Sequence, residues 1–145
     1  NEKLFYESLP QLREHVSDRA LMRAMHFFEE NKRVLQAVEA VKSDNISAFL
    51  EAVNASGESS WKLLQNTHAT GSTAQAMTLG LALSRRILGK KGACRVHGGG
   101  FGGTILAFVP DALKQTYTEK MERVFGKNAC VELSVRPIGS TCVEL

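Results

Sequence analysis

The sequence lacks a long apolar run. No stretch approaches the roughly 18 consecutive apolar residues that a membrane-spanning helix needs. The first ten residues, NEKLFYESLP, have no continuous apolar core of the kind that marks a signal peptide. We therefore expect a cytoplasmic protein with no membrane partner.

Cysteine and histidine are also scarce. The three cysteines are odd in number, scattered and without a C-x-x-C pair: Cys94, Cys130 and Cys142. The four histidines show no mutual metal-ligand spacing: His15, His26, His68 and His97. Secreted disulfide scaffolds and zinc sites have denser, regularly spaced ligands. The sequence predicts reduced thiols and no metal site.

Charge of one sign is not in large excess. Lysine and arginine number 18 against 15 acidic residues, a net charge of +3. A dedicated nucleic-acid binder usually shows clustered basic charge, so no nucleic-acid partner is expected. The 145 residues contain no repeat or linker and have the size of one domain. Because the chain starts at Asn1 rather than at methionine, we expect a piece of a longer protein.

The first half of the chain has mainly helical patterns. Residues 3–16 read as a weakly ordered opening segment broken at Pro10, and residues 23–28 fit a strand or a helix. Apolar spacing predicts a helix through residue 42 and a second one capped by Ser43 or Asp44 and ending at Gly57. A third helix is predicted over residues 72–88, buried on most sides, with Gly89 after it.

The last third of the chain predicts a sheet. Residues 93–97, 104–109 and 129–135 are strand candidates, residues 141–145 are a weaker one, and residues 110–126 predict a helix. The predicted class is α+β, with helices packed on one face of an antiparallel sheet. If residues 23–28 form a strand, the order becomes a ferredoxin-like split βαβ core with additional helices.

One glycine-rich loop carries a chemical signal. Five of the six residues from Gly98 to Gly103 are glycine, which reaches positive φ without steric cost and leaves no Cβ between backbone and ligand. The N–H groups of such a loop can form a concavity for anions, and Arg95 lies just upstream. A turn needs only one or two glycines, so the pattern favours close approach of a ligand over chain reversal alone. The G-K-S/T ending of a Walker loop is absent.

The glycine loop resembles the third signature of the GHMP kinases, the superfamily that includes galactokinase. Galactokinases typically show R-M-T-G-G-G-F-G-G before an apolar strand. The matching residues are Arg95, Gly98, Gly99, Gly100, Phe101, Gly102 and Gly103. Upstream, a second segment is similar to the galactokinase pattern R-A-x-H-x-x-x-E-N and, with one residue more between the two positions, to D-x-x-x-F. Its matching residues are Arg23, Ala24, His26, Glu30, Asn31, Asp44 and Phe49. The resemblance extends over residues 19–135.

The sequence departs from the family pattern at two places. His97 stands where the family usually has threonine or serine. The run from Ser56 to Ser60 and on to Asn66 replaces the usual S-H-x-S-L and Y-x-V-S segments. These departures leave the sugar specificity open.

The resemblance implies the carboxy-terminal domain of a two-domain kinase. The whole protein would transfer a phosphoryl group from ATP, with Mg²⁺, to the anomeric hydroxyl of galactose, giving galactose 1-phosphate. This chain would supply the loop from Gly98 to Gly103 near the phosphates, with Arg95 and His97 as supporting residues, and no catalytic residue. The phosphate loop P-x-x-x-G-L-S-S-S-A of the amino-terminal domain is absent. The partners implied are the sugar and that missing domain, and the isolated chain is expected to be inactive and to bind neither ATP nor Mg²⁺.

Two alternatives remain open, and a third is disfavoured. The chain fits a kinase of the same superfamily that acts on another small hydroxylated substrate. It also fits a stand-alone ferredoxin-like regulatory domain that binds a small molecule. An RNA-recognition module is disfavoured because Gly103 and Thr104 occupy the place of a stacking aromatic residue.

Overall fold

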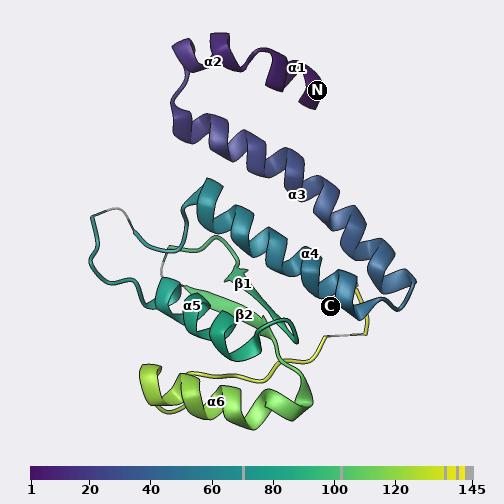
Figure 1. The fold of residues 1–145 in the computed structure, drawn as a ribbon, viewed down its shortest axis with the longest axis vertical. Helices are drawn as coiled ribbons and strands as arrows, with labels where there is room; N and C mark the ends of the chain where they lie inside the picture. The colour runs from purple at the N-terminus through teal and green to yellow at the C-terminus, as the bar shows by residue number, and fades with distance from the viewer. Residues whose placement is uncertain (70, 102, 136, 140, 143–145) are drawn as a thin grey trace.

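The computed structural model describes residues 1–69, 71–101, 103–135, 137–139 and 141–142. Within them it contains six α-helices, one π-helical turn and a two-stranded antiparallel sheet (Figure 1). The elements in chain order are α1 (Glu2–Glu7), α2 (Leu9–His15), α3 (Asp18–Lys42), α4 (Ile46–Ser59), η1 (Ser60–Leu64), α5 (Ala76–Leu88), β1 (Ala93–His97), β2 (Thr104–Phe108) and α6 (Asp111–Phe125). The predicted α+β class is confirmed.

The amino-terminal segment is helical. The expectation of a weakly ordered opening segment is wrong, because Pro10 lies in the first turn of α2, where its missing N–H costs no helical hydrogen bond. The strand considered at residues 23–28 is also wrong, since these residues lie inside α3. Ser17 caps α3 by accepting the Ala20 N–H. The 25 residues of α3 include no glycine or proline, the two residues that most disfavour a helix.

The helix α4 packs along α3 and continues into η1. Its cap is Asn45, whose side chain accepts a backbone N–H, so the predicted caps Ser43 and Asp44 are wrong. Gly57 lies inside α4 and does not end it. A Cβ atom at Gly57 would stand 2.8 Å from the carbonyl oxygen of Cys94 in β1. Glycine is needed there because helix and strand approach closely.

The strands β1 and β2 form the predicted antiparallel hairpin, and α4 covers the open edge of β1. Asn54 of α4 takes the place of a neighbouring strand. Its Oδ1 accepts the Cys94 N–H at 3.2 Å, and its Nδ2 donates to the Gly92 carbonyl at 3.2 Å. Because backbone groups at this edge are satisfied by a side chain, the edge is closed to pairing with another strand.

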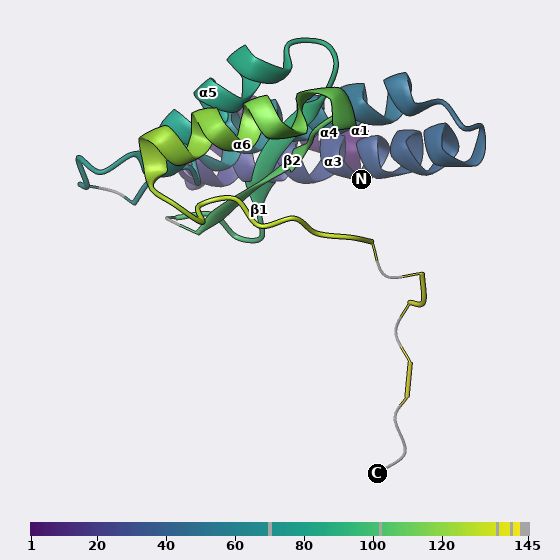
Figure 2. The ribbon, with the colours of Figure 1, turned by 90° about the horizontal axis from the view of Figure 1, so that it is seen from below.

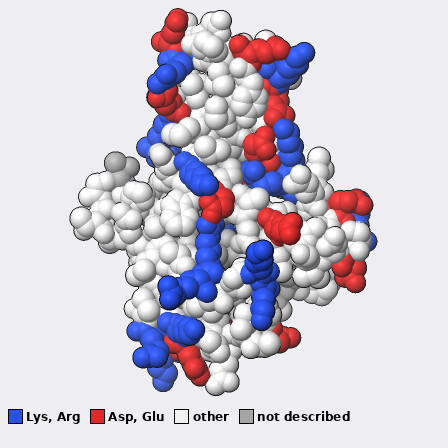
Figure 3. Space-filling view, in the orientation of Figure 1, with Lys and Arg blue, Asp and Glu red and all other residues white. Residues whose placement is uncertain are grey.

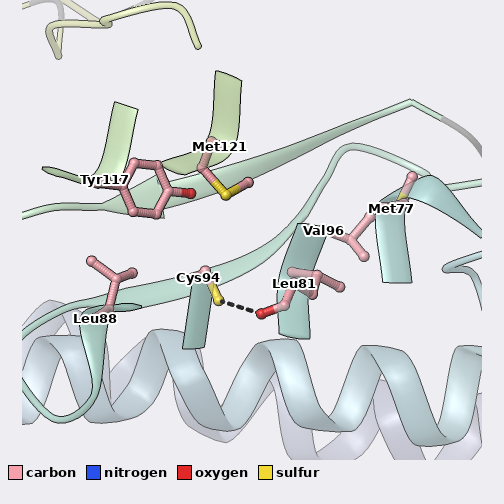
Figure 4. Packing of buried hydrophobic residues seen from close by; sticks show 7 residues of the cluster. All are labelled: Met77, Leu81, Leu88, Cys94, Val96, Tyr117 and Met121. Carbon is pink, nitrogen blue, oxygen red and sulfur yellow. Dashed lines mark hydrogen bonds between the residues drawn. The ribbon is translucent and has the colours of Figure 1, made fainter. Parts of the chain in front are cut away.

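The main hydrophobic core lies between the hairpin, α5 and α6 (Figure 4). Its buried members are Met77, Leu81, Leu88, Cys94, Val96, Tyr117 and Met121. Its polar atoms are paired: the Cys94 thiol donates to the Leu81 carbonyl at 3.8 Å, and the hydroxyls of Ser84 and Tyr117 are hydrogen-bonded at 2.8 Å. The helix α5 begins at Ala76 rather than at residue 72, and it is buried along one side only, since Leu79 is 54% exposed.

The predicted strand over residues 129–135 is wrong. The structure assigns no strand there, although apolar and polar residues alternate, and Val131, Leu133 and Val135 are largely exposed. In Figure 2 this segment leaves α6, runs past the hairpin and turns away. Thr141 and Cys142 form no strand either, and residues 143–145 lie outside the described residues. An alternating segment forms a strand only where a partner strand pairs with it. The described residues therefore form only part of the expected ferredoxin-like core, namely one hairpin covered by helices.

Candidate functional site

The glycine loop joins β1 to β2 with a sharply bent backbone. Gly98, Gly100 and Phe101 have φ values of +68°, +86° and +62°, and Gly102 lies outside the described residues. Glycine adopts positive φ without steric cost, whereas a phenylalanine there must be held by its surroundings. The loop therefore has a conformation that the rest of the fold has to stabilise.

The inner side of the loop packs on Asn66. A Cβ atom at Gly100 would stand 2.2 Å from the backbone oxygen of Asn66. That oxygen accepts the Phe101 N–H at 2.6 Å, and the Asn66 Nδ2 donates to the Gly99 carbonyl at 3.3 Å. The glycine at position 100 is thus required by the protein itself.

The outer side of the loop is open. Cβ atoms built at Gly98 and Gly99 meet no atom within 4 Å, and both residues are exposed. The loop therefore has one side fixed by the protein and one side at which a ligand can reach the backbone.

The π-helical turn η1 positions Asn66. Ser60 begins this turn, Gln65 ends it in the left-handed conformation at φ +54°, and the Ser60 hydroxyl donates to the Asn66 Oδ1 at 2.9 Å. Both Ser60 and Asn66 are almost completely buried. Turns of this kind are frequent at functional sites. The sequence reasoning missed Asn66 as a site residue; the only signal was that residues 64–66 depart from the family pattern.

Arg95 forms an ion pair with Glu30 of α3. Its Nη1 lies 3.2 Å from the Glu30 Oε1, and the Arg33 Nε lies 2.8 Å from the Glu30 Oε2. The Ser56 hydroxyl also donates to Glu30. Burial acts to raise the pKa of Glu30, but the hydrogen bonds from Ser56 and Arg33 and the positive charges nearby outweigh it, so that this pKa lies below its ordinary value. Arg95 thus ties β1 to α3 through an ionised carboxylate.

His26 lies beside this ionic cluster. Its Nδ1 and the Ser59 Oγ share a hydrogen bond of 3.0 Å. Burial lowers the pKa of His26, and although the charge of Glu30 acts to raise it, the charges of Arg33 and Arg95 lower it further. The family-like residues His26, Glu30 and Arg95 therefore meet in one place and join α3, α4 and β1.

His97 ends β1 opposite Thr104 and is exposed. It lies at the rim of a cavity of about 310 Å³ that Gly103 and Thr104 also line. The rest of the lining is mostly apolar and includes Ile105 and Phe125. The structure thus brings His97 to the base of the loop and pairs Arg95 with Glu30. The supporting role predicted for these two residues stays a prediction.

Polar and aromatic residues around η1 form further contacts. Ser59 and Ser60 both form hydrogen bonds, Ser59 with His26 and Ser60 with Asn66. Trp61 packs against the hydrophobic core. Arg85 pairs with Glu58 and lies 5.3 Å from the centre of the Trp61 ring.

The distribution of charged and metal-ligating side chains does not define the site further. On the face drawn in Figure 3, acidic and basic side chains are interspersed, with basic ones more frequent in the lower half. In the described part of the chain, no group of three histidine, cysteine or acidic side chains has the geometry to hold a metal ion. None of the helices seen there is long and apolar enough to cross a membrane. Phe101 lies in the loop rather than on a strand, so it does not form the stacking surface of an RNA-recognition module.

Sequence comparison points in the same direction as the loop. The chain is 32% identical over 115 residues to a protein of Haemophilus influenzae (strain PittEE), 36% identical over 108 residues to one of Actinobacillus succinogenes, and 31% identical over 126 residues to one of Glaesserella parasuis. All three are galactokinases. The matches cover 77%, 72% and 84% of this chain.

The matched region is only part of each galactokinase. The chain spans 28%, 26% and 31% of the length of these relatives, so most of their sequence has no counterpart in it. No protein-family model matches the chain. The chain is therefore galactokinase-like over about three quarters of its length.

Proposed function

We propose that this chain is the carboxy-terminal domain of a galactokinase-type sugar kinase of the GHMP superfamily. The glycine loop from Gly98 to Gly103 would form one wall of the phosphate site, in a crevice shared with an amino-terminal domain. The observation that carries the proposal is the two-sided loop, which is fixed on Asn66 and open at Gly98 and Gly99. Backbone N–H groups in such a bent loop bind anions without a charged side chain.

The proposed reaction is transfer of the ATP γ-phosphoryl group to the anomeric hydroxyl of galactose. Catalysis of this kind depends on positioning and on stabilisation of phosphate charge. The open backbone at Gly98 and Gly99 suits phosphate oxygens, while the described residues offer no acidic cluster for Mg²⁺. Mg²⁺ would be held by the amino-terminal domain. The chain's own contribution is to position phosphate and exclude water, and its proposed location is the cytosol.

In this proposal His97 supports the binding of the substrate. It replaces the usual threonine or serine and lies at the base of the loop beside Thr104. An imidazole is larger than a threonine side chain and is able to donate to a phosphate or sugar oxygen. We assign it to substrate selection, because it is one of two positions at which the chain departs from the family signature, and the other, Val96, is buried in the core.

A chimera tests the proposal. In the galactokinase of H. influenzae, this chain replaces the matching residues, and galactose-dependent release of ADP is measured. We expect activity, and we expect Gly99→Ala to lower kcat/KM by at least about tenfold, because a methyl group on the open side displaces phosphate. Gly139→Ala is the control, since a Cβ there also meets nothing within 4 Å. A folded chimera without activity, or equal kinetics for the two variants, contradicts the proposal.

A further inference from the structure

We propose that Asn66 is the positioning residue of the glycine loop. The effect that we expect on catalysis rests on the proposed function, whereas the effect on the conformation of the loop does not. It concerns a residue that lies outside the glycine signature, 32 positions or more before the loop along the chain. Its role is to hold the inner side of the loop so that Gly98 and Gly99 keep their backbone turned to the ligand.

Three contacts converge on Asn66. Its side chain receives a hydrogen bond from Ser60 at 2.9 Å and donates one to the Gly99 carbonyl at 3.3 Å. Its backbone oxygen accepts the Phe101 N–H at 2.6 Å. The side-chain amide thus uses its acceptor toward η1 and its donor toward the loop, which an alanine, a leucine or an ionised aspartate cannot do.

The shape of the loop depends on the same contact. Gly100 has no room for a side chain, because its Cβ position falls 2.2 Å from the Asn66 oxygen. Phe101 stays at a positive φ of +62°, an unfavourable conformation for a residue with a side chain. Such conformations persist where the surroundings hold them, and the hydrogen bond to Asn66 is the contact that holds Phe101.

Burial makes the arrangement costly to disturb. Asn66 is 4% exposed and Ser60 is 1% exposed, so water cannot readily replace a lost partner. Gln65, directly before Asn66, is itself at positive φ, which directs the chain out of η1 toward the loop. The turn η1 is therefore tied to the loop at Gly99 and Phe101, and we infer that the position of Asn66 sets that of Gly98 and Gly99.

The first test measures the loop in the 145-residue chain. Asn66→Ala is compared with wild type by amide hydrogen exchange and by the NMR signals of Gly98, Gly99 and Phe101. We expect the Phe101 N–H to exchange about tenfold faster or more. The variant keeps the backbone oxygen that accepts this N–H, but without the side-chain bonds to Ser60 and Gly99 the loop opens more often and breaks that bond. Ser60→Ala, which removes only the Ser60–Asn66 bond, is expected to show a smaller change in the same direction, and it replaces Asn66→Ala if that variant does not fold.

Asn54→Ala is the matched control. Asn54 is also an asparagine whose side-chain amide both donates and accepts a hydrogen bond. Its partners are the Gly92 carbonyl and the Cys94 N–H, which lie away from the loop. We expect it to lower the Tm while leaving the loop signals unchanged. If Asn66→Ala leaves Phe101 exchange unchanged, or if Asn54→Ala accelerates it equally, Asn66 is not a positioning residue.

The second test measures catalysis in the active chimera. We expect Asn66→Ala to raise the KM for ATP about tenfold with a smaller change in kcat, and Asn54→Ala to change neither. Asn66→Gln, which keeps donor and acceptor, should restore part of the loss. An inactive chimera would contradict the proposed function, whereas the exchange measurement would still decide the role of Asn66. Unchanged KM with altered exchange would contradict the link between the loop position and phosphate.

Discussion

At the scale of single residues, glycines that look alike in the sequence have different tasks. Gly100 faces Asn66, whereas Gly98 and Gly99 face open space. The sequence indicates only that the loop is rich in glycine, because the reason for each one lies in a neighbour far away along the chain. Asn66 was missed for the same reason, and so was the pairing of Arg95 with Glu30, which lies 65 positions earlier in the chain.

Gly100→Ala should destabilise the fold more than Gly98→Ala. Both positions have positive φ, which costs about 1–2 kcal/mol for a residue with a Cβ. Only at Gly100 does the new atom collide with backbone, which adds about 1–3 kcal/mol. Urea unfolding of the two variants measures the difference. Equal losses in the free energy of unfolding would show that Asn66 moves aside without cost.

His26 should make stability depend on pH near neutrality. Burial lowers the pKa of the folded state below the ordinary value of 6.5, so the unfolded chain binds a proton more readily. Stability from the neutral imidazole is complete above 6.5 and is lost as the pH falls through the folded-state pKa. We expect the urea midpoint to drop between about pH 7.5 and about pH 5.5, and His26→Gln to reduce this drop. A drop of the same size in the variant would assign the effect to other groups.

At the scale of elements, the sequence predicted well the parts that local pattern decides. The hairpin, α5, α6 and the glycines that end both helices are present. The errors lie where tertiary contact decides. Gly57 suggests a helix end but lies in a helix that touches β1, and residues 129–135 alternate but pair with no strand among the residues that the structure describes. Pro10 begins a helix rather than breaking a segment.

Gly57→Ala tests the packing of α4 on β1. Helix propensity alone predicts a gain of about 1 kcal/mol from this substitution. The Cβ would instead stand 2.8 Å from the Cys94 oxygen, a backbone atom that moves only with its strand. We therefore expect a net loss of up to about 2 kcal/mol in the free energy of unfolding.

The control for this substitution is Ala55→Gly on the exposed side of α4. There only propensity acts, and a loss of about 1 kcal/mol is expected. If Gly57→Ala stabilises the chain by the amount that Ala55→Gly destabilises it, the helix and the strand are not in close contact in solution.

At the scale of the whole molecule, the proposed function gives this chain one wall of a phosphate site and assigns the catalytic residues to another domain. The described residues contain a backbone surface suited to phosphate, with no metal-binding cluster beside it. The galactokinases that it resembles are much longer, since the matched part makes up only 26% to 31% of three of them. Under the proposed function, the isolated chain should show no phosphorylation of galactose, and a measurable rate in a coupled ADP assay would contradict this.

The crystal structure of the active chimera with galactose and a non-hydrolysable ATP analogue is the most direct test of the proposed role of the loop. We predict that the N–H groups of Gly98 and Gly99 lie about 3 Å from phosphate oxygens. We also predict that Asn66 keeps its bonds to Gly99 and Phe101. Phosphates bound elsewhere, with the open side of the loop facing solvent, would contradict the account.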